Sequence, residues 1–353
     1  MKRIVSMLIV TTLAVALGGA LFAQSATPKA AKLKVVLYMN GNLGDRAFFD
    51  SANRGVLRAQ KELGITVKSV EGGYDSAKWE PDLEQLCNGD WDVIIAGTWQ
   101  LQELVQKLAG KYPAKKFITY DTSVDYSKPG VGNVYSILYS QNEGSYLAGA
   151  MAAMLTTSSK VKYVNADKKI GFIGGMDIPV INDFKVGFIQ GARDVDPKVE
   201  VLVSYAGNFN DPAKGKELAL AMFDQGADVI FNGAAQTGLG ILDAGKVKKH
   251  YTIGVDSDQY ILYKDNDPEM ASFIVSSMMK NVDESLFRAL KLHLAGTLPY
   301  GKVETLGLKD KGIALAVNEN YLKIVPADIQ AKIKVLADKI AKGTLKVDTA
   351  FGN

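Results

Sequence analysis

Strand-like and helix-like segments alternate along nearly the whole chain, and this alternation most limits the possible folds. Short runs rich in valine and isoleucine are followed by amphipathic stretches long enough for helices. Strand–helix alternation of this kind predicts parallel sheets with right-handed crossover helices. The predicted strands form two sets: Lys34–Met39, Thr66–Val70, Val93–Gly97, Phe117–Tyr120 and Val134–Tyr139, then Ile170–Gly174, Val199–Tyr205, Val229–Asn232 and Thr252–Val255.

Helices are predicted between these strands. They are Arg46–Leu63, Gln102–Lys111, Gly144–Leu155, Phe184–Val195, Pro212–Gln225 and Gly238–Lys248. Gly64 and Gly226 follow two of them, where a helix commonly ends in a left-handed residue. The two strand sets therefore predict an α/β protein with two doubly wound parallel-sheet lobes.

Composition and charge exclude several classes of function. The 353-residue chain has a formal net charge of +3, which is too small for a nucleic-acid-binding surface on a protein of this length. Its one cysteine, Cys87, and two histidines, His250 and His293, cannot build a Cys/His metal cage. We therefore expect no metal site, no cofactor and no nucleic-acid partner.

The first residues have the pattern of an export signal. Lys2 and Arg3 precede an apolar run from Ile4 to Leu17, and Ala23 offers a small residue before Gln24. The cleavage pattern is imperfect because Leu21 holds the outer small-residue position, and an uncleaved anchor is the alternative. We expect a signal peptide at residues 1–23, a leader at 24–32, and a protein that is exported to the periplasm or another extracytoplasmic space.

Aromatic rings and carboxylates recur just after the predicted strands. In open parallel sheets, ligands bind beyond the carboxyl ends of the strands, so these positions are the candidate site. The residues there are Asn40, Gly44, Asp45, Phe48, Phe49, Asp50, Thr98, Trp99, Gln100, Asp121, Gly175, Met176, Asp177, Asn208, Phe209, Asn210, Asp211, Gly233, Gln236, Thr237, Gly238, Asp256 and Asp258.

This combination favours a flat ring bearing hydroxyl groups. Aromatic faces stack on a heterocycle, and carboxylates accept hydrogen bonds from sugar hydroxyls. Phosphate recognition would need lysine, arginine or glycine-rich amides instead. Single residues have plainer explanations: Asp45 and Asp211 are also good helix N-caps, and Phe48 could be a core residue.

Catalysis has little support in the sequence. The chain contains no G-x-S-x-G motif, no H-E-x-x-H motif and no cysteine–histidine motif. Its carboxylates alternate with aromatics and do not form the isolated pair of a glycosidase. We expect a binding protein with no catalytic residues.

Several longer motifs resemble the basic membrane protein family, which are substrate-binding proteins of ABC importers similar to purine-nucleoside receptors. They run in order from about Lys34 to Lys309: "GDRAFFDSA", "NEGSYLAGAMAA", "IGFIGGMDIPVI", "GNFNDPAKGKELA", "GADVIF", "IGVDSDQ" and "SSMMK". The resemblance implies a type I periplasmic-binding fold, with a three-segment hinge and a nucleoside in the cleft between the lobes. It also implies a membrane permease as partner, and we expect a monomer.

The resemblance implies roles for individual residues. Asp45 and Asp121 would be polar contacts, and Phe48 and Phe209 the rings that sandwich the base. Asp256 and Lys280 would contact the ribose hydroxyls, while Gly233 would allow close backbone approach. From the residues alone, Lys280 would be taken for a solvated lysine.

One departure from the family pattern bears on the ligand. The nucleoside-binding motif usually reads D-K-S-F-N-[DQ], whereas this chain has Phe49 in place of the amide that reads the base edge. Trp99 is also larger than expected. A larger heterocycle such as riboflavin is therefore the alternative ligand, unless Phe49 belongs to its helix's core and Trp99 only caps the lobe.

The predicted lobe boundaries follow the expected crossovers. Lobe one comprises residues 33–139 and 257–302, and lobe two comprises 140–256 and 303–353. A sensor that reports a ligand to a membrane partner would have the same sequence as an importer component. A transcription regulator would need a DNA-binding segment where the export signal lies.

Overall fold

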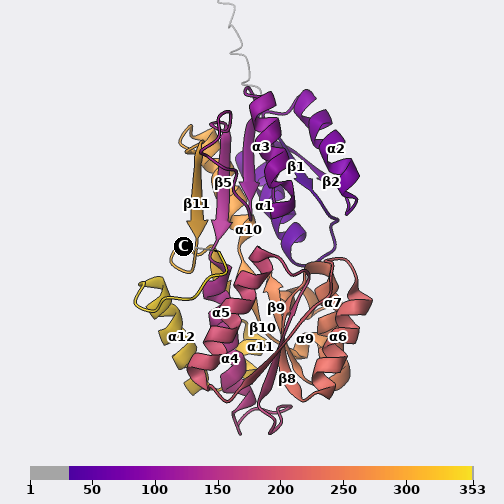
Figure 1. Ribbon diagram of the computed structural model, residues 1–353, viewed down its shortest axis with the longest axis vertical. Helices are drawn as coiled ribbons and strands as arrows, with labels where there is room; N and C mark the ends of the chain where they lie inside the picture. The colour runs from indigo at the N-terminus through magenta and orange to yellow at the C-terminus, as the bar shows by residue number, and fades with distance from the viewer. Residues whose placement is uncertain (1–31, 352–353) are drawn as a thin grey trace, which may run out of the picture. The chain divides into compact units, whose positions relative to one another are not determined.

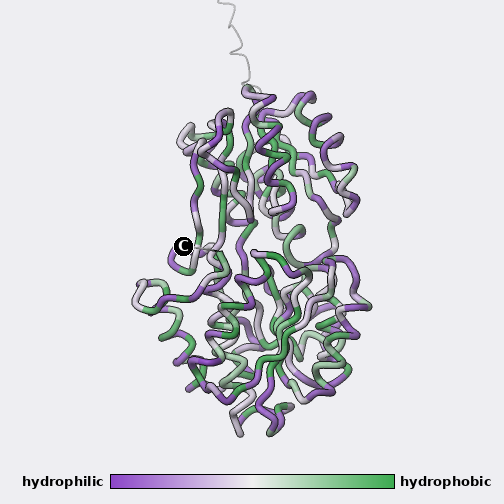
Figure 2. Tube along the Cα trace, viewed as in Figure 1, coloured by the Kyte–Doolittle hydropathy of each residue, from purple (hydrophilic) through white to green (hydrophobic). Residues whose placement is uncertain are grey.

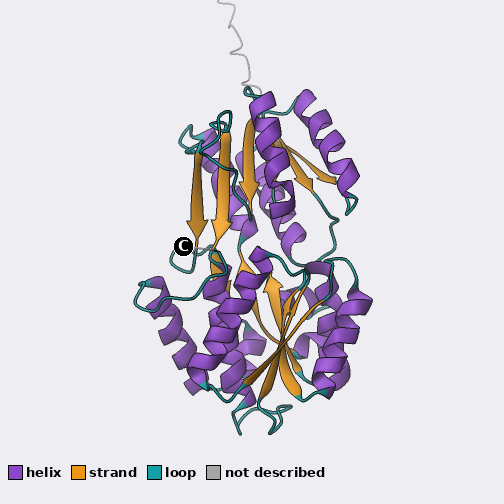
Figure 3. Ribbon diagram, viewed as in Figure 1, coloured by secondary structure: helices purple, strands orange, loops and turns teal. Residues whose placement is uncertain are grey.

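The computed structural model describes residues 32–351, which form two α/β lobes (Figure 1, Figure 3). The predicted signal peptide and all but the last residue of the predicted leader lie outside the described residues. Within residues 32–351, no helix combines the length and apolar composition that a bilayer span requires.

The first lobe is built on a six-stranded parallel sheet in the order β11-β5-β4-β3-β1-β2. Its elements are β1 Lys34–Met39, α1 Phe48–Leu63, β2 Thr66–Glu71, α2 Ser76–Asn88, β3 Val93–Ala96, α3 Gln102–Lys111, β4 Lys116–Tyr120, β5 Val134–Tyr139, α10 Val282–Leu294 and β11 Lys302–Leu306, with a short 3-10 helix η1 at Trp99–Leu101. Strand β1 is buried on both faces: Val35 and Leu37 pack with α1 and α10, and Val36 and Tyr38 with α2 and α3.

The second lobe repeats this plan with the order β12-β10-β9-β8-β6-β7. Its elements are α4 Gln141–Thr156, β6 Lys169–Gly174, α5 Pro179–Val195, β7 Glu200–Tyr205, α6 Pro212–Asp224, β8 Ala227–Gly233, η2 Ala235–Thr237, α7 Gly238–Lys248, β9 Tyr251–Asp256, α8 Gln259–Tyr263, α9 Pro268–Ser272, β10 Ile274–Lys280, β12 Ile313–Leu315, α11 Glu319–Ile324 and α12 Ala327–Ala341. Strand β12 alone in this sheet runs antiparallel to its neighbour. The apolar residues of the strands form its interior (Figure 2).

Three segments cross between the lobes: Ser140 joins β5 to α4, Asn281 joins β10 to α10, and residues 307–312 join β11 to β12. They are hydrogen-bonded to one another. The Ser140 backbone N–H donates to Leu306 O at 3.0 Å, and the Asn281 backbone N–H donates to Gly312 O at 2.9 Å. The predicted two-lobe fold with a three-segment hinge is therefore confirmed, and a linked set of crossovers suits hinge closure.

Two of the predicted lobe boundaries are wrong. Residues 257–302 were expected in lobe one, but β10 pairs with β9 in the second sheet, and lobe one resumes only at α10. Residues 303–353 were expected in lobe two, but β11 pairs with β5 in the first sheet. Strand β11 is a largely exposed edge strand, so it carries no apolar run that could have revealed it.

Glycines bring the backbones of α4 and α5 into direct contact, and the two helices lie side by side in Figure 1. A Cβ at Gly149 would overlap the Phe188 carbonyl oxygen, and a Cβ at Gly191 would overlap that of Tyr146. Any side chain at these positions must therefore push the helices apart. The first turns of α5 line the cavity between the lobes, so this packing also fixes the position of one cavity wall.

We expect Gly149→Ala to lower the free energy of unfolding by about 1–3 kcal/mol, the usual cost of overpacking a close-packed interior. Gly110→Ala on α3 is the matched control, because the nearest atom to its Cβ is Gly130 O at 4.0 Å. That change should be neutral or stabilising by up to about 1 kcal/mol. Urea unfolding followed by circular dichroism measures both, and equal effects of the two substitutions would contradict the close approach of α4 and α5.

Candidate functional site

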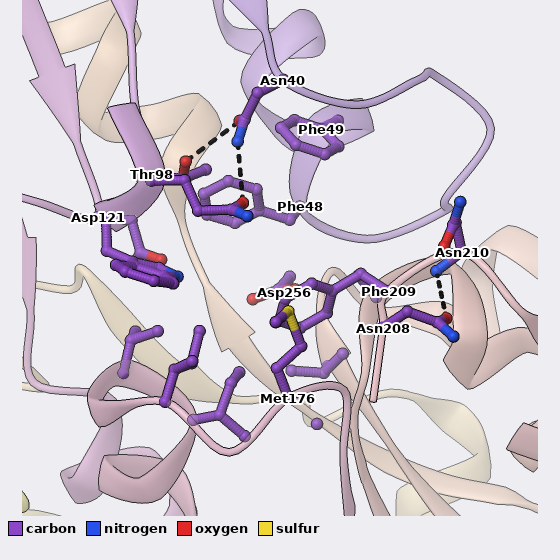
Figure 4. A pocket seen from close by; sticks show the side chains of 18 of the residues that line it. Asn40, Phe48, Phe49, Thr98, Asp121, Met176, Asn208, Phe209, Asn210 and Asp256 are labelled. Atoms are coloured by element: carbon purple, nitrogen blue, oxygen red, sulfur yellow. Dashed lines mark hydrogen bonds between the residues drawn. The ribbon is translucent and has the colours of Figure 1, made fainter. Parts of the chain in front are cut away.

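A cavity of about 450 Å³ lies between the carboxyl ends of the strands of the two lobes (Figure 4). This volume is within the range of small-molecule sites. Lobe one contributes residues that follow β1, β2, β3 and β4, and lobe two contributes residues at or after the ends of β6, β7, β8, β9 and β10. The strand-end rule therefore located the cavity from the sequence.

All the predicted ligand residues except Asp45 line this cavity. They are Phe48, Phe49, Trp99, Asp121, Phe209, Gly233, Asp256 and Lys280. Trp99 stands at the edge, with 43% of its surface exposed, whereas Phe48 and Phe49 are buried. The cavity thus brings together predicted residues that are up to 232 positions apart in the sequence, from Phe48 to Lys280.

Asp45, which was also predicted as a ligand contact, does not line the cavity. It is fully buried, and its two carboxylate oxygens accept backbone N–H groups of Ala47, Phe49 and Asp50 at 2.8–3.1 Å. Its oxygens satisfy free amides of the first turn of α1 from a position two residues before the N-cap residue, Ala47. Asp211 is itself the N-cap residue of α6 and accepts the Lys214 backbone N–H at 2.9 Å, as the sequence allowed.

The turn before α1 determines where the two phenylalanines lie. Gly44 and Arg46 have φ values of 92° and 48°, and their backbone N–H groups both donate to the Asp50 carboxylate, at 2.9 Å each. From lobe two, the Ser257 hydroxyl donates to Ala47 O at 3.1 Å. Gln259 Nε2 of lobe two also donates to Arg46 O at 3.2 Å. Local and inter-lobe hydrogen bonds therefore hold the start of α1, and with it Phe48, at the cavity wall.

Two glycines make room for aromatic rings on opposite sides of the cavity. A Cβ at Gly41 would overlap the Phe49 ring, and a Cβ at Gly175 would overlap the Phe209 ring. Phe49 also meets Phe48 edge to face, with ring centroids 5.4 Å apart. Phe49 is therefore both a cavity residue and a packing residue of its helix, so the two interpretations left open by the sequence both apply.

A buried charge cluster occupies the interior end of the cavity. Lys280 Nζ lies 2.6 Å from Asp121 Oδ1, and their side chains are 2% and 12% exposed. Nζ also lies within 4.7–5.6 Å of the ring centroids of Phe48, Tyr139 and Phe184. Because this ammonium is almost completely buried, the sequence-based view of Lys280 as a solvated lysine is wrong.

Asp256 is the second carboxylate of this cluster. Burial raises its pKa to about 7, the positive charge of Lys280 partly opposes that rise, and the negative charge of Asp121 adds to it. Burial also raises the pKa of Asp121, again opposed by Lys280. Both aspartates have left-handed backbones, with φ of 60° and 63°, a strained conformation that tends to cluster at ligand sites.

Some cavity residues were not among the predicted ligand residues. Asn40, Thr98 and Gln100 are among the strand-end candidates, but they were given no ligand role. Tyr74, on the loop after β2, also follows a predicted strand, whereas Phe184, inside α5, has no strand-end signal. No group of three or more His, Cys, Asp or Glu side chains placed to hold a metal ion occurs among residues 32–351.

The raised pKa of Asp256 makes stability depend on pH. The folded pKa of about 7 exceeds the unfolded value near 3.8, so the folded state binds the proton more tightly. The contribution of this proton to the free energy of unfolding is fully present below pH 3.8 and is lost as pH rises through 7. We expect Asp256→Asn, which cannot titrate, to become progressively more stable relative to the unsubstituted protein across this window, by at most about 4 kcal/mol. Urea unfolding at several pH values measures this difference, and parallel pH profiles for the two proteins would contradict it.

Comparison with known proteins shows which family of proteins this chain resembles. A family model, Bmp, described as "ABC transporter substrate-binding protein PnrA-like", matches residues 32–347. The chain is 31% identical to the "ABC transporter nucleoside-binding protein BmpA" of Lactococcus lactis, over 88% of each chain. It is 28% identical to "Basic membrane protein D" of Borreliella burgdorferi, over 89% of this chain and 87% of that one.

Solved structures show the same fold. A solute-binding protein of an ABC transporter system from Aeropyrum pernix K1 superposes with a TM-score of 0.80 at 27% identity, covering 90% of this chain and 93% of that one. One from Conexibacter woesei has a TM-score of 0.70 at 23% identity, covering 91% and 100%. With the family model spanning nearly all described residues, this chain belongs to the Bmp family of PnrA-like ABC transporter substrate-binding proteins.

Proposed function

We propose that this protein is the extracytoplasmic receptor of an ABC importer and that its ligand is a purine nucleoside. The observation that carries the proposal is the combination of Phe48 and Phe209, which face one cavity from opposite lobes, with a buried charge cluster at the same cavity (Figure 4). A nucleoside has one part for each: a flat base and a hydroxyl-bearing sugar.

The rings suit the base. Phe48 comes from lobe one and Phe209 from lobe two, so a base stacked between them touches both lobes. Stacking on an aromatic face tolerates different bases, because every base has a π-face. Contact with both lobes also makes closure about the hinge favourable when ligand is bound.

The charge cluster suits the sugar. The ionised carboxylates of Asp121 and Asp256 accept hydrogen bonds from hydroxyl groups, and Lys280 donates to a sugar oxygen. Because Asp121 already pairs with Lys280, the cluster has no excess positive charge with which to hold a phosphate. A nucleoside therefore fits this end of the cavity better than a nucleotide does.

The relatives support the same assignment. The Lactococcus lactis relative is named as a nucleoside-binding protein of an ABC transporter. The apolar run at Ile4–Leu17 is consistent with export, and a permease in the membrane would receive the ligand. Riboflavin, the alternative suggested by Phe49 and Trp99, has no relative named for it among these proteins, and it becomes a competing ligand in the test.

We expect Phe209→Ala to weaken nucleoside binding about ten- to a hundredfold, because loss of one stacking ring costs about 1–3 kcal/mol. Phe351→Ala is the matched control, since that ring is exposed and does not line the cavity. Isothermal titration calorimetry should show tight binding of inosine or guanosine and weak binding of uridine, ribose and riboflavin. Unchanged nucleoside affinity in Phe209→Ala would contradict stacking of the base between Phe48 and Phe209. Tight binding of riboflavin without binding of any nucleoside would identify riboflavin as the ligand instead.

A further inference from the structure

Three polar side chains at the ends of β1 and β3 form a hydrogen-bonded chain on the cavity wall. The Thr98 hydroxyl donates to Asn40 Oδ1 at 3.1 Å, and Asn40 Nδ2 donates to Gln100 Oε1 at 3.0 Å (Figure 4 shows the Asn40 contacts). Asn40 is buried, and all three residues line the cavity. Both amide oxygens are therefore engaged within the chain of bonds.

In the hydrogen-bonded series Thr98–Asn40–Gln100, the polar groups without a partner among the described residues are N–H donors. Gln100 Nε2 makes no hydrogen bond to any residue in 32–351, and Asn40 Nδ2 keeps a second N–H beyond the one it gives to Gln100. A ligand atom that reaches this wall therefore meets N–H groups from two amides.

The side-chain amide of Asn208, on the opposite lobe, also presents an N–H donor. Asn208 Oδ1 accepts the backbone N–H of Asn210 at 3.1 Å and the Thr237 hydroxyl at 3.2 Å. A backbone N–H can only donate, so the orientation of this amide is fixed, and its Nδ2 is left without a hydrogen-bond partner among the described residues. Figure 4 shows the Asn208–Asn210 contact across the cavity from Asn40.

These amides matter because the expected edge-reading amide is absent. Phe49 holds that position and packs its ring over Gly41, so it offers no hydrogen bond to a base. Reading of the base edge then falls to Asn40, Gln100 and Asn208, whose free groups are donors.

We propose that the cavity selects 6-oxopurine nucleosides, such as inosine and guanosine, over adenosine. A 6-oxopurine presents the acceptors O6 and N7 side by side, whereas adenine presents an N6 amino donor beside N7. Donors facing O6 are satisfied, whereas a donor facing an amino group leaves both groups unpaired, and this costs most at the buried amide of Asn40. This inference rests on the proposed nucleoside function and adds the class of base.

The direction of the hydrogen bonds among Thr98, Asn40 and Gln100 decides whether donors or acceptors face the cavity. A hydroxyl can donate or accept, so if Thr98 accepted from Asn40, both amides would turn over and Gln100 Oε1 would face the cavity. That arrangement would favour adenosine. The preference between inosine and adenosine therefore reports the direction of these hydrogen bonds.

The test is the ratio of inosine to adenosine affinity, measured by titration calorimetry at pH 7 with guanosine as a third ligand. We expect the unsubstituted protein to bind inosine and guanosine about ten- to a hundredfold more tightly than adenosine, the usual effect of one unpaired buried donor. Gln100→Glu and Asn208→Asp place an acceptor where a donor stood. At least one of them should shift the ratio toward adenosine by about tenfold or more.

Gln60→Glu is the matched control. It makes the same change of charge at an exposed position of α1, outside the cavity lining. Because inosine and adenosine are both uncharged, this change should leave the ratio as it was. Thermal melting of each variant checks that the fold is retained.

The possible failures are distinguishable. Equal binding of inosine and adenosine, tighter binding of adenosine, or a ratio that neither Gln100→Glu nor Asn208→Asp alters would overturn the donor-edge assignment while leaving a nucleoside receptor. If none of the three nucleosides binds, the proposed function itself fails, and this inference fails with it.

Discussion

The ion pair between Lys280 and Asp121 joins the two lobes at the interior end of the cavity. Asp121 follows β4 of lobe one, and Lys280 ends β10 of lobe two, one residue before the Asn281 crossover. Removing two charges from water costs several kcal/mol per ion, which the partner and further hydrogen bonds must offset. A cluster of this kind is weak evidence for stability, but it concentrates charged acceptors and a donor where both sheets meet.

The rest of the cavity is arranged around that cluster by close backbone contacts. Gly41 and Gly175 let the Phe49 and Phe209 rings lie against strand-end backbone, and the hydrogen bonds of Asp45 to the first turn of α1 hold Phe48 beside Lys280. Rings held by packed backbone lose little freedom when a ligand stacks on them, which lowers the entropic cost of binding. Burial raises the pKa of the Asp256 carboxyl to about 7. Ligand hydroxyls can offset that burial by donating to the carboxylate.

Much of the fold and the site follows from the sequence for a simple reason. Parallel strands place their carboxyl ends along one edge, so Phe48, Asp121, Phe209 and Asp256 could be grouped without any contact information. Asp45 shows the limit of this rule, because a carboxylate that binds the first amides of a helix and one that binds a ligand have the same position in the sequence. The hydrogen bonds of Asn40 show another limit, since Thr98 and Gln100 lie 58 and 60 residues away and only the fold brings them within reach. Strand β11 was missed because an exposed edge strand needs no apolar run.

We expect ligand hydroxyls to bind the ionised form of Asp256, because a carboxylate accepts hydrogen bonds from hydroxyl groups. The most direct measurement is the number of protons exchanged on binding of inosine, obtained by calorimetry at about pH 6.5 in two buffers of different ionisation enthalpy. The raised pKa of Asp256 predicts that the unsubstituted protein releases a fraction of a proton as the carboxylate ionises, and that Asp256→Asn releases measurably less. Binding of inosine without proton release, or an equal release by Asp256→Asn, would contradict this account.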